Sequence, residues 1–451
     1  EKQVMAIDVR RLAVEALTRV QQESSYSSAV LDSILNKYGD EIPQPDQALL
    51  SRLYYGVLER LLTLDYIIET HSKIKLKKMH PVVVQILRLG CYQLIFMDKI
   101  PAPAAVFESV KLAKKMKQER ASGFINAVLR SVDRDRGSLF DSLPGGIQGL
   151  SIRTSCPEEL LKMWEKSYGM EYTEKIALSA NQPPPVTIRV NTLKLTTEEF
   201  EDILDKAGIP YSRHSFLPAC YNIDDIYRLK RVAEIPKNCY YHQDAASQIC
   251  CKALDPRPGE RIADVCSAPG GKSITSAQYM GNKGEILAFD IHPFKRDIIE
   301  ERTKSMGVSI VRADVRDASS PCPDELAEKF DRVLCDVPCS GLGVIRRKPE
   351  IRYKPLESFA GLPGLQYEIL HQSSRMVRPG GVLQYSTCTL NVEENEGVVE
   401  RFLNEHPEFS PRILPLKECF NRSGTKPSHQ ITLFPHLFDT DGFYIASFVK
   451  K

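Results

Sequence analysis

The sequence has no apolar run long enough to span a membrane, and no basic-then-apolar stretch that is typical of a signal peptide. Its 12 cysteines are scattered without the spacing of a disulfide framework. Free thiols at this frequency are typical of a reducing compartment. We therefore expect a cytoplasmic protein without a membrane anchor, and we take a monomer as the default state.

The chain of 451 residues also has almost no net charge, with a formal value of only +2. The imbalance is local: residues 1–140 contain 21 Lys and Arg against 16 Asp and Glu, which is a mild indication of an acidic partner. A hydrophobic content of 42% and a charged content of 26% are those of a globular protein. The length favours two or three domains.

The first 140 residues read as helices. Residues 10–20, 49–68 and 82–97 repeat apolar side chains at three- and four-residue spacing. Prolines 81, 101 and 103 stand where helices would begin. We predict an all-α N-terminal domain over residues 1–140.

A smaller mixed segment follows over residues 141–236. A Gly-rich hinge at 137–150 leads into this segment, which contains two helical patterns, 157–169 and 197–208. Between them, PPPVTIRVNTL (183–193) alternates in the way that predicts a strand. We interpret this segment as a small α+β linker domain.

From residue 237 to 451 the pattern becomes strand, loop and helix in alternation. The strand-like stretches are RIADVC (261–266), EILAFDI (285–291), SIVRADV (309–315), DRVLCDV (331–337) and GVLQYST (381–387). This order predicts a C-terminal α/β domain with a Rossmann-like, parallel, doubly wound sheet.

Glycines and acids follow the predicted strands of this domain. CSAPGGKS (266–273) lets a ligand approach bare backbone near a helix start, although it lacks the spacing of a dinucleotide fingerprint or of a P-loop. Asp290, Asp314 and Asp336 end the next strands, where open α/β sheets bind ligands. Taken singly, the glycines could form a tight turn and each acid could cap a helix.

Two cysteines also follow predicted strands of this sheet. Cys339 lies in DVPCSG (336–341) and Cys388 in GVLQYSTCTL, so both should reach the same edge and form a reaction centre with Asp336. Each alone could be a buried, inert thiol. Zinc is a weak alternative, because Cys335 and Cys339 have neither a second cysteine pair nor a nearby histidine, and we predict no metal. A disulfide between Cys339 and Cys388 is disfavoured in a reducing compartment.

Three motifs together, CSAPGGK, DVPCSGLG and YSTCTLNVEENE, resemble the signature of S-adenosylmethionine-dependent RNA cytosine-5 methyltransferases. The likeness is closest to the bacterial Sun/Fmu/RsmB group, which modifies small-subunit ribosomal RNA, and it covers almost the whole chain. It implies a NusB-like, RNA-binding N-terminal domain and a class I methyltransferase domain at the C-terminus. Ser267, Val337 and Gln384 depart slightly from the family pattern, without loss of a functional group.

The resemblance also implies roles for individual residues. Cys388 would be the nucleophile, Cys339 the thiol that assists product release, and Asp336 an active-site carboxyl group. Asp290 would hold the ribose hydroxyls of S-adenosylmethionine, and Asp314 would lie by its adenine. The remainder of the cofactor would be wrapped by the glycine loop, which consists of Cys266, Ser267, Ala268, Pro269, Gly270, Gly271 and Lys272.

Basic stretches supply candidate RNA contacts. IRRKPEIRYK (345–354), with Arg346, Arg347 and Lys348, mixes cations with an aromatic ring, which suits phosphates and stacked bases. Lys114 and Lys115 are further candidates, although a charge run is often only a solvated face. Other functions stay open: an RNA-binding assembly factor without catalysis, or a cytosine-5 methyltransferase that acts on another RNA or on DNA. A DNA enzyme of this kind would use Cys339 as its nucleophile.

Overall fold

The structure is a computed structural model that describes residues 7–23 and 27–451. The chain divides into two compact units. Unit 1 comprises Glu1–Gln182 together with Ile345–Lys354, and unit 2 comprises Pro183–Val344 together with Pro355–Lys451. Within the described residues, no helix is both long enough and apolar enough to cross a membrane.

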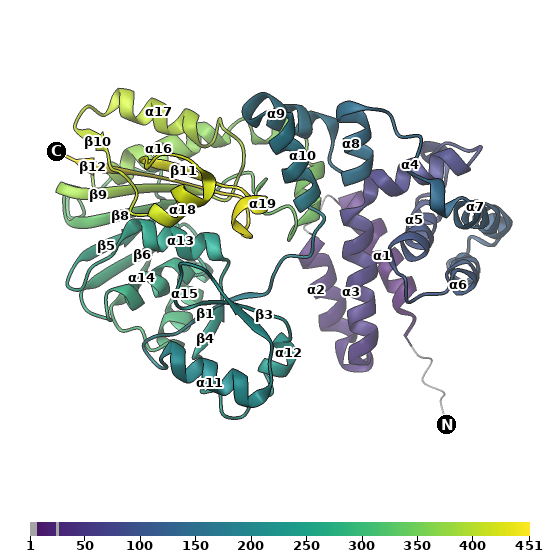
Figure 1. Cartoon of the computed structure of the whole chain (residues 1–451), viewed down its shortest axis with the longest axis horizontal. Coiled ribbons are helices and arrows are strands. Elements are labelled where there is room, and N and C mark those ends of the chain that lie inside the picture. The colour runs from purple at the N-terminus through teal and green to yellow at the C-terminus, as the bar shows by residue number, and fades with distance from the viewer. Residues whose placement is uncertain (1–6, 24–26) are drawn as a thin grey trace. The chain divides into compact units, whose positions relative to one another are not determined.

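Unit 1 is built from helices (Figure 1). They are α1 (Val9–Glu23), α2 (Ser27–Tyr38), α3 (Gln44–Glu59), α4 (Leu61–His71), α5 (Pro81–Phe96), α6 (Ala102–Lys115), α7 (Ser122–Arg134), α8 (Gly146–Thr154), α9 (Glu158–Tyr168) and α10 (Met170–Ser179). The inserted segment, Ile345–Lys354, adds the short 3₁₀ helix η5 (Pro349–Tyr353) to this unit.

Helix α5 is the centre of the unit 1 core, because all its residues from Val83 to Leu94 are buried. Amphipathic neighbours such as α7 turn only one face toward it, with Ile125 and Leu129 fully buried. The apolar stretch 49–68, which the sequence presents as one continuous helical pattern, is divided between α3 and α4 at Arg60, whose φ of −117° is not helical.

A four-stranded antiparallel sheet begins unit 2. Its strands run in the order β2 (Tyr211–Arg213), β3 (Cys220–Ile223), β1 (Thr187–Val190) and β4 (Tyr240–His242), accompanied by α11 (Thr197–Ala207) and α12 (Ile226–Leu229). Thr196 and Glu199 form a reciprocal capping box that fixes the start of α11. The predicted linker segment 141–236 is thus shared between the units, because α8–α10 belong to unit 1 and this sheet to unit 2.

The large sheet of unit 2 has the order β10-β12-β9-β8-β5-β6-β7, and β11 pairs with β12. Its strands are β5 (Arg261–Asp264), β6 (Glu285–Asp290), β7 (Val311–Val315), β8 (Phe330–Asp336), β9 (Val377–Thr387), β10 (Phe409–Pro411), β11 (Gln430–Leu433) and β12 (Phe443–Lys450). Strands β5 to β9 are parallel, as predicted, but β12 runs antiparallel to β9, so the sheet is mixed rather than wholly parallel.

Helices cover both faces of this sheet (Figure 1). On one face lie α13 (Ala245–Leu254), α14 (Gly271–Tyr279) and α15 (Pro293–Ser305), and on the other α16 (Leu362–Ser374) and α17 (Glu396–Glu405). The short helices α18 (Lys417–Ser423) and α19 (Pro435–Phe438) complete the first layer. The strand order reverses between β5 and β8, and ligands of such folds bind outside the carboxyl ends of the strands at this switch point.

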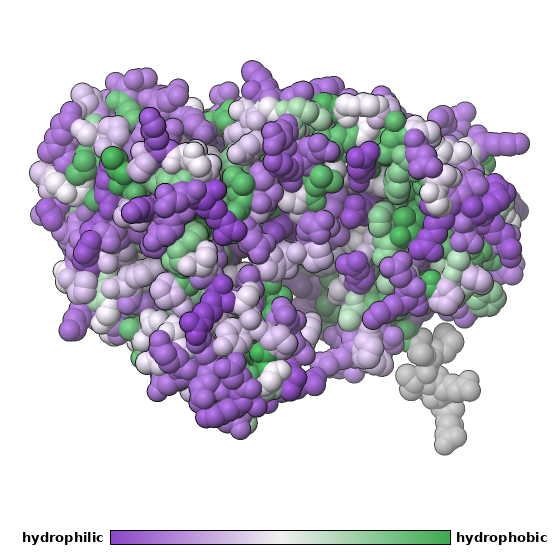
Figure 2. Space-filling view, in the orientation of Figure 1, coloured by the Kyte–Doolittle hydropathy of each residue, from purple (hydrophilic) through white to green (hydrophobic). Residues whose placement is uncertain are grey.

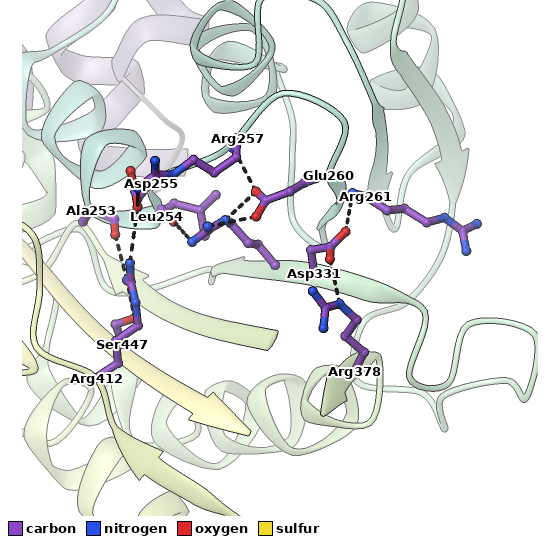
Figure 3. Close-up of polar contacts among 11 residues, drawn as sticks. Ala253, Leu254, Asp255, Arg257, Glu260, Arg261, Asp331, Arg378, Arg412 and Ser447 are labelled. Atoms are coloured by element: carbon purple, nitrogen blue, oxygen red, sulfur yellow. Dashed lines mark hydrogen bonds and ion pairs between the residues drawn. The ribbon is translucent and has the colours of Figure 1, made fainter. Parts of the chain in front are cut away.

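The amino ends of the same strands are closed by ion pairs (Figure 3). Asp331 at the start of β8 accepts hydrogen bonds from the Arg261 backbone at 2.7 Å and from Arg378 at 2.6 Å. Arg332 forms a two-pronged ion pair with Glu260, at 2.6 and 2.9 Å. These contacts join β5, β8 and β9 at the edge away from Asp336, so the carboxyl edge is the one left for a site.

The molecular face in Figure 2 is mostly hydrophilic, with apolar side chains in small groups. Such scattered apolar groups are ordinary on a folded chain and do not by themselves mark a site.

Candidate active site

A cavity of about 380 Å³ opens at the carboxyl ends of β5, β6 and β8. Asp290, at the end of β6, is only 7% exposed and forms an ion pair with Lys295 at 3.4 Å. The lining residues are Val265, Cys266, Ala268, Asp290, Ile291, His292, Lys295, Arg316, Asp317, Ala318, Asp336, Val337, Pro338, Leu365 and Ile369. Carboxylates beside apolar walls suit a ligand that combines a flat ring with hydroxyl groups.

Asp314 does not line this cavity. It lies in the edge strand β7, is exposed, and accepts a hydrogen bond from the backbone N–H of Val315 at 2.7 Å. Asp317, three residues further on, lines the cavity instead. The resemblance implied that Asp314 lies by the adenine of the cofactor, but the acid of this segment that reaches the cavity is Asp317.

The glycine loop connects β5 to α14 as predicted. Gly270 adopts a φ of +90°, a left-handed conformation that favours glycine, and its N–H donates to Ser267 O at 2.7 Å. This turn places the start of α14 at Gly271, and the first backbone N–H groups of a helix have no acceptor within the helix.

A second cavity of about 200 Å³ lies on the other side of the loop and shares Cys266, Ala268 and Asp336 with the first. It adds Asp264, whose Oδ2 accepts a hydrogen bond from Ser273 Oγ at 2.7 Å. Asp264 Oδ1 is buried without a hydrogen-bond partner among the residues that the structure describes. Burial raises the pKa of Asp264 to about 6. Sequence reasoning missed this residue, because the strand pattern RIADVC treats it as an ordinary core position.

Asp336 ends β8 and is held by two contacts. Its Oδ2 forms an ion pair with Lys272 Nζ at 2.6 Å, and its Oδ1 accepts from Ser386 Oγ at 2.8 Å. Burial favours the neutral form of Lys272, but the adjacent Asp336 carboxylate outweighs this and raises the pKa of the ammonium group above its ordinary value. Asp336 lines both cavities, and its partner Lys272 lines the second.

The two cysteines predicted to meet do so. Asp336 pairs in register with Ser386 of the neighbouring parallel strand β9, so the loops that follow the two strands emerge side by side. Cys339 Sγ and Cys388 Sγ lie 3.1 Å apart, and both are half-buried thiols that are not joined in a disulfide. The hydrogen bond to Cys388 and burial raise the pKa of Cys339 above its ordinary value.

Backbone contacts hold the cysteine loops together. Gly343 N–H donates to Cys388 O at 3.0 Å, and Gly442 N–H donates to Gly343 O at 2.8 Å. A Cβ atom at Gly343 would lie 2.0 Å from Gly442 O and 2.8 Å from Cys388 O, so only glycine fits between these loops.

The inserted segment 345–354 holds helices of unit 1 together, although its basic composition favours contact with nucleic acid. Arg352 is 1% exposed, and its guanidinium donates to Asn181 Oδ1 (2.9 Å) and to the main-chain carbonyls of Ala180 (3.0 Å) and Thr154 (3.3 Å). It also reaches Glu59 O at 3.5 Å, so it serves the carboxyl ends of α3, α8 and α10. The Tyr353 hydroxyl donates to Leu58 O at 2.8 Å.

The named RNA-contact candidates differ in exposure. Arg346 is buried, at 7% exposure, whereas Arg347 and Lys348 are exposed. Lys114 is exposed at the end of α6, and Lys115 forms an ion pair with Asp8 at 2.6 Å. Of these candidates, Arg346 is the least accessible to RNA, because its side chain is buried.

The doubly wound sheet, the glycine loop after its first parallel strand and the acids at the switch point define a class I methyltransferase type of domain. Comparison with known proteins agrees. The model described as 16S rRNA methyltransferase RsmB/F matches residues 251–449, the NusB family model matches 7–134, and a ferredoxin-like domain model of RsmF/B-like methyltransferases matches 156–229.

Relatives match along the whole chain. The probable ribosomal RNA small subunit methyltransferase B of Bacillus subtilis strain 168 is 37% identical, over 98% of this chain and 99% of the relative. The ribosomal RNA small subunit methyltransferase B of Klebsiella pneumoniae is 30% identical, over 99% of each chain. A solved methyltransferase homolog from Pyrococcus horikoshii is 28% identical with a TM-score of 0.59, covering 68% of this chain and all of that one. The chain belongs to the RsmB/F family of 16S rRNA methyltransferases, which confirms the resemblance and the fold class predicted from the sequence.

Proposed function

We propose that this chain transfers a methyl group from S-adenosylmethionine to carbon 5 of a cytosine in small-subunit ribosomal RNA, in the cytoplasm. Family membership supports the enzyme class and the RNA substrate. The observation that carries the covalent mechanism is the 3.1 Å pair of Cys339 and Cys388, beside the ion pair of Lys272 with Asp336.

The residues around the two cavities fit S-adenosylmethionine. Asp290, half-enclosed by apolar walls, would accept hydrogen bonds from the ribose hydroxyls, and Asp317 would lie by the adenine. The unpartnered Oδ1 of Asp264 would accept the ammonium group of the methionine part, beside the glycine loop Cys266–Lys272. When bound, the cofactor supplies the methyl group.

Carbon 5 of cytosine is a weak nucleophile, and the protein must activate it. We assign this to Cys388, whose thiolate would add to carbon 6 and leave carbon 5 enamine-like. The addition moves negative charge onto the ring, where Asp336 can share a proton with N3. Lys272 and Ser386 hold that carboxyl group in place through both of its oxygens.

The adduct must then come apart. After methylation the carbon-5 proton leaves to solvent, and the carbon–sulfur electron pair returns to Cys388 as the bond breaks. Cys339, at 3.1 Å, would donate its S–H hydrogen bond to the departing sulfur, which stabilises the thiolate that leaves. RNA would reach the site as a single-stranded or flipped-out nucleotide. The exposed Arg347, Lys348, Lys114 and Lys115 are proposed backbone contacts.

The test combines methyl incorporation with covalent trapping. We expect the full chain to transfer radiolabelled methyl groups to unmodified small-subunit RNA, whereas a binding factor without catalysis would transfer none. A substrate with 5-fluorocytosine should be trapped covalently by the wild type but not by Cys388→Ala. Cys339→Ala should accumulate adduct on ordinary RNA. Loss of trapping in Cys339→Ala, with trapping retained in Cys388→Ala, would instead favour the DNA-type mechanism.

A further inference from the structure

Glu394, in the turn before α17, carries a fully buried carboxylate that the mechanism above does not use. Its Oε2 accepts hydrogen bonds from the backbone N–H of Ser340 at 2.8 Å and from Gln366 Nε2 at 2.9 Å. Its Oε1 accepts from Asn391 Nδ2 at 3.0 Å. All three partners donate, which is the pattern that an ionised carboxylate requires.

These contacts enclose Cys339 from both sides along the chain. Ser340, the residue after the cysteine, is bound to Glu394 directly. Pro338, the residue before it, is bound through Gln366, whose Nε2 donates to Pro338 O at 2.9 Å as well as to Glu394. The backbone on either side of the thiol is therefore fixed by a single carboxylate.

The same carboxylate also ties in the loop of Cys388. Asn391 follows that cysteine in the chain and donates to Glu394. Thr389, the residue next to Cys388, shares a hydrogen bond of 2.7 Å with Ser340, and both hydroxyl groups are buried. Glu394 thus connects the two loops whose sulfur atoms lie 3.1 Å apart.

The charge of Glu394 acts on the same thiol. Titratable groups that interact with Cys339 include Cys388 and Tyr385, from β9 and the loop after it, and Glu394 from the turn before α17. Helix α16 contributes only the neutral amide Gln366 to this contact. The hydrogen bond to Cys388 and burial raise the pKa of Cys339 most, and the nearby Glu394 carboxylate raises it further, because a negative charge disfavours the thiolate.

We propose that Glu394 is the positioning residue of the cysteine pair: its carboxylate fixes the Cys339 loop against the Cys388 loop, and its charge keeps Cys339 a protonated hydrogen-bond donor. The roles of the two thiols rest on the proposed function. The arrangement explains why only one of two adjacent cysteines would serve as the nucleophile. Cys339 would stay a donor to the sulfur of Cys388 rather than compete with it for the pyrimidine.

The experiment measures the pH at which Cys339 becomes reactive, without any RNA. Iodoacetamide alkylates thiolates, so the rate at Cys339, read by peptide mass spectrometry in full-length Cys388→Ala protein, reports its ionisation. Adding Glu394→Gln should lower the midpoint pH by about one unit. In the same Cys388→Ala background, Glu394→Asp keeps the charge, so its midpoint pH should lie close to that of the parent. The matched control is Glu393→Gln, an exposed neighbour whose loss should leave the midpoint unchanged.

A midpoint that is the same in Glu394→Gln and in its parent overturns the proposal, as does an equal shift in Glu393→Gln. If the Glu394→Gln protein does not fold, Glu394→Asp is compared with its parent instead. Because this variant keeps the charge, a large shift of its midpoint pH would also contradict the proposal. In protein with Cys388 intact, Glu394→Gln should lower kcat for methyl transfer about tenfold at unchanged KM for RNA, with accumulated adduct. The alkylation result stands even where the wild type fails to methylate RNA, so the two proposals fail separately.

Discussion

Replacing Arg352 by methionine should destabilise unit 1 by about 3 kcal/mol, because each buried acceptor left without its donor costs about 1–3 kcal/mol. The guanidinium makes its shortest contacts, at 2.9 and 3.0 Å, with Asn181 Oδ1 and Ala180 O, and it also reaches the last turns of α3 and α8. Removing a buried charge regains part of the loss, since the desolvation of the guanidinium is no longer needed. The net loss of folding free energy is therefore well below the sum of the costs of all the acceptors that lose their donor.

Hydrogen exchange read by mass spectrometry resolves this change locally. About 3 kcal/mol corresponds to roughly a hundredfold faster exchange for amides of α3, α8 and α10 that open with this region. Arg352→Lys keeps the charge but lacks the planar fork, so its effect should be intermediate. Arg347→Met, an exposed side chain of the same segment, is the control. Exchange in the three helices that accelerates less than about threefold in Arg352→Met would refute the reasoning.

Three further outcomes follow from the site. Asp264, with its pKa raised to about 6, takes up a proton as pH falls through that value, so affinity for S-adenosylmethionine measured by calorimetry should weaken below pH 6. Asp264→Asn should lower the affinity about tenfold and abolish this pH dependence. Gly343→Ala would bring a Cβ to 2.0 Å from Gly442 O, so covalent trapping should slow at least about tenfold while cofactor affinity is kept. Lys272→Met leaves the Asp336 carboxylate without its ion pair, and single-turnover methyl transfer should fall about a hundredfold; transfer within about twofold of the wild type would contradict the assigned role of this pair.

Much of unit 2 could be predicted because its signals are local. Strands β5, β6 and β8 lead into the glycine loop or end in an acid, and β9 leads into Cys388. Asp290, Asp336 and both cysteines thus lie where predicted strands end. The direction of β12 was not predictable in this way, since an apolar run of eight residues reads the same whichever way it pairs. Asp314 shows a similar limit: a strand pattern locates the end of β7 but not which of the following acids turns toward the cavity.

The inserted segment shows what local patterns omit. Residues 345–354 contain five Arg and Lys, a composition that favours nucleic acid. Arg352 nevertheless lies among carbonyls of helices that are far away in the sequence. The chain enters this segment six residues after Cys339. Deleting residues 1–182 would therefore remove the acceptors of Asn181, Ala180, Thr154 and Glu59 that hold the segment, and would alter the chain that follows the Cys339 loop. A loss of activity on such truncation would not by itself identify the helical unit as an RNA-binding domain, so point substitutions at exposed cations such as Lys114 are the sharper test.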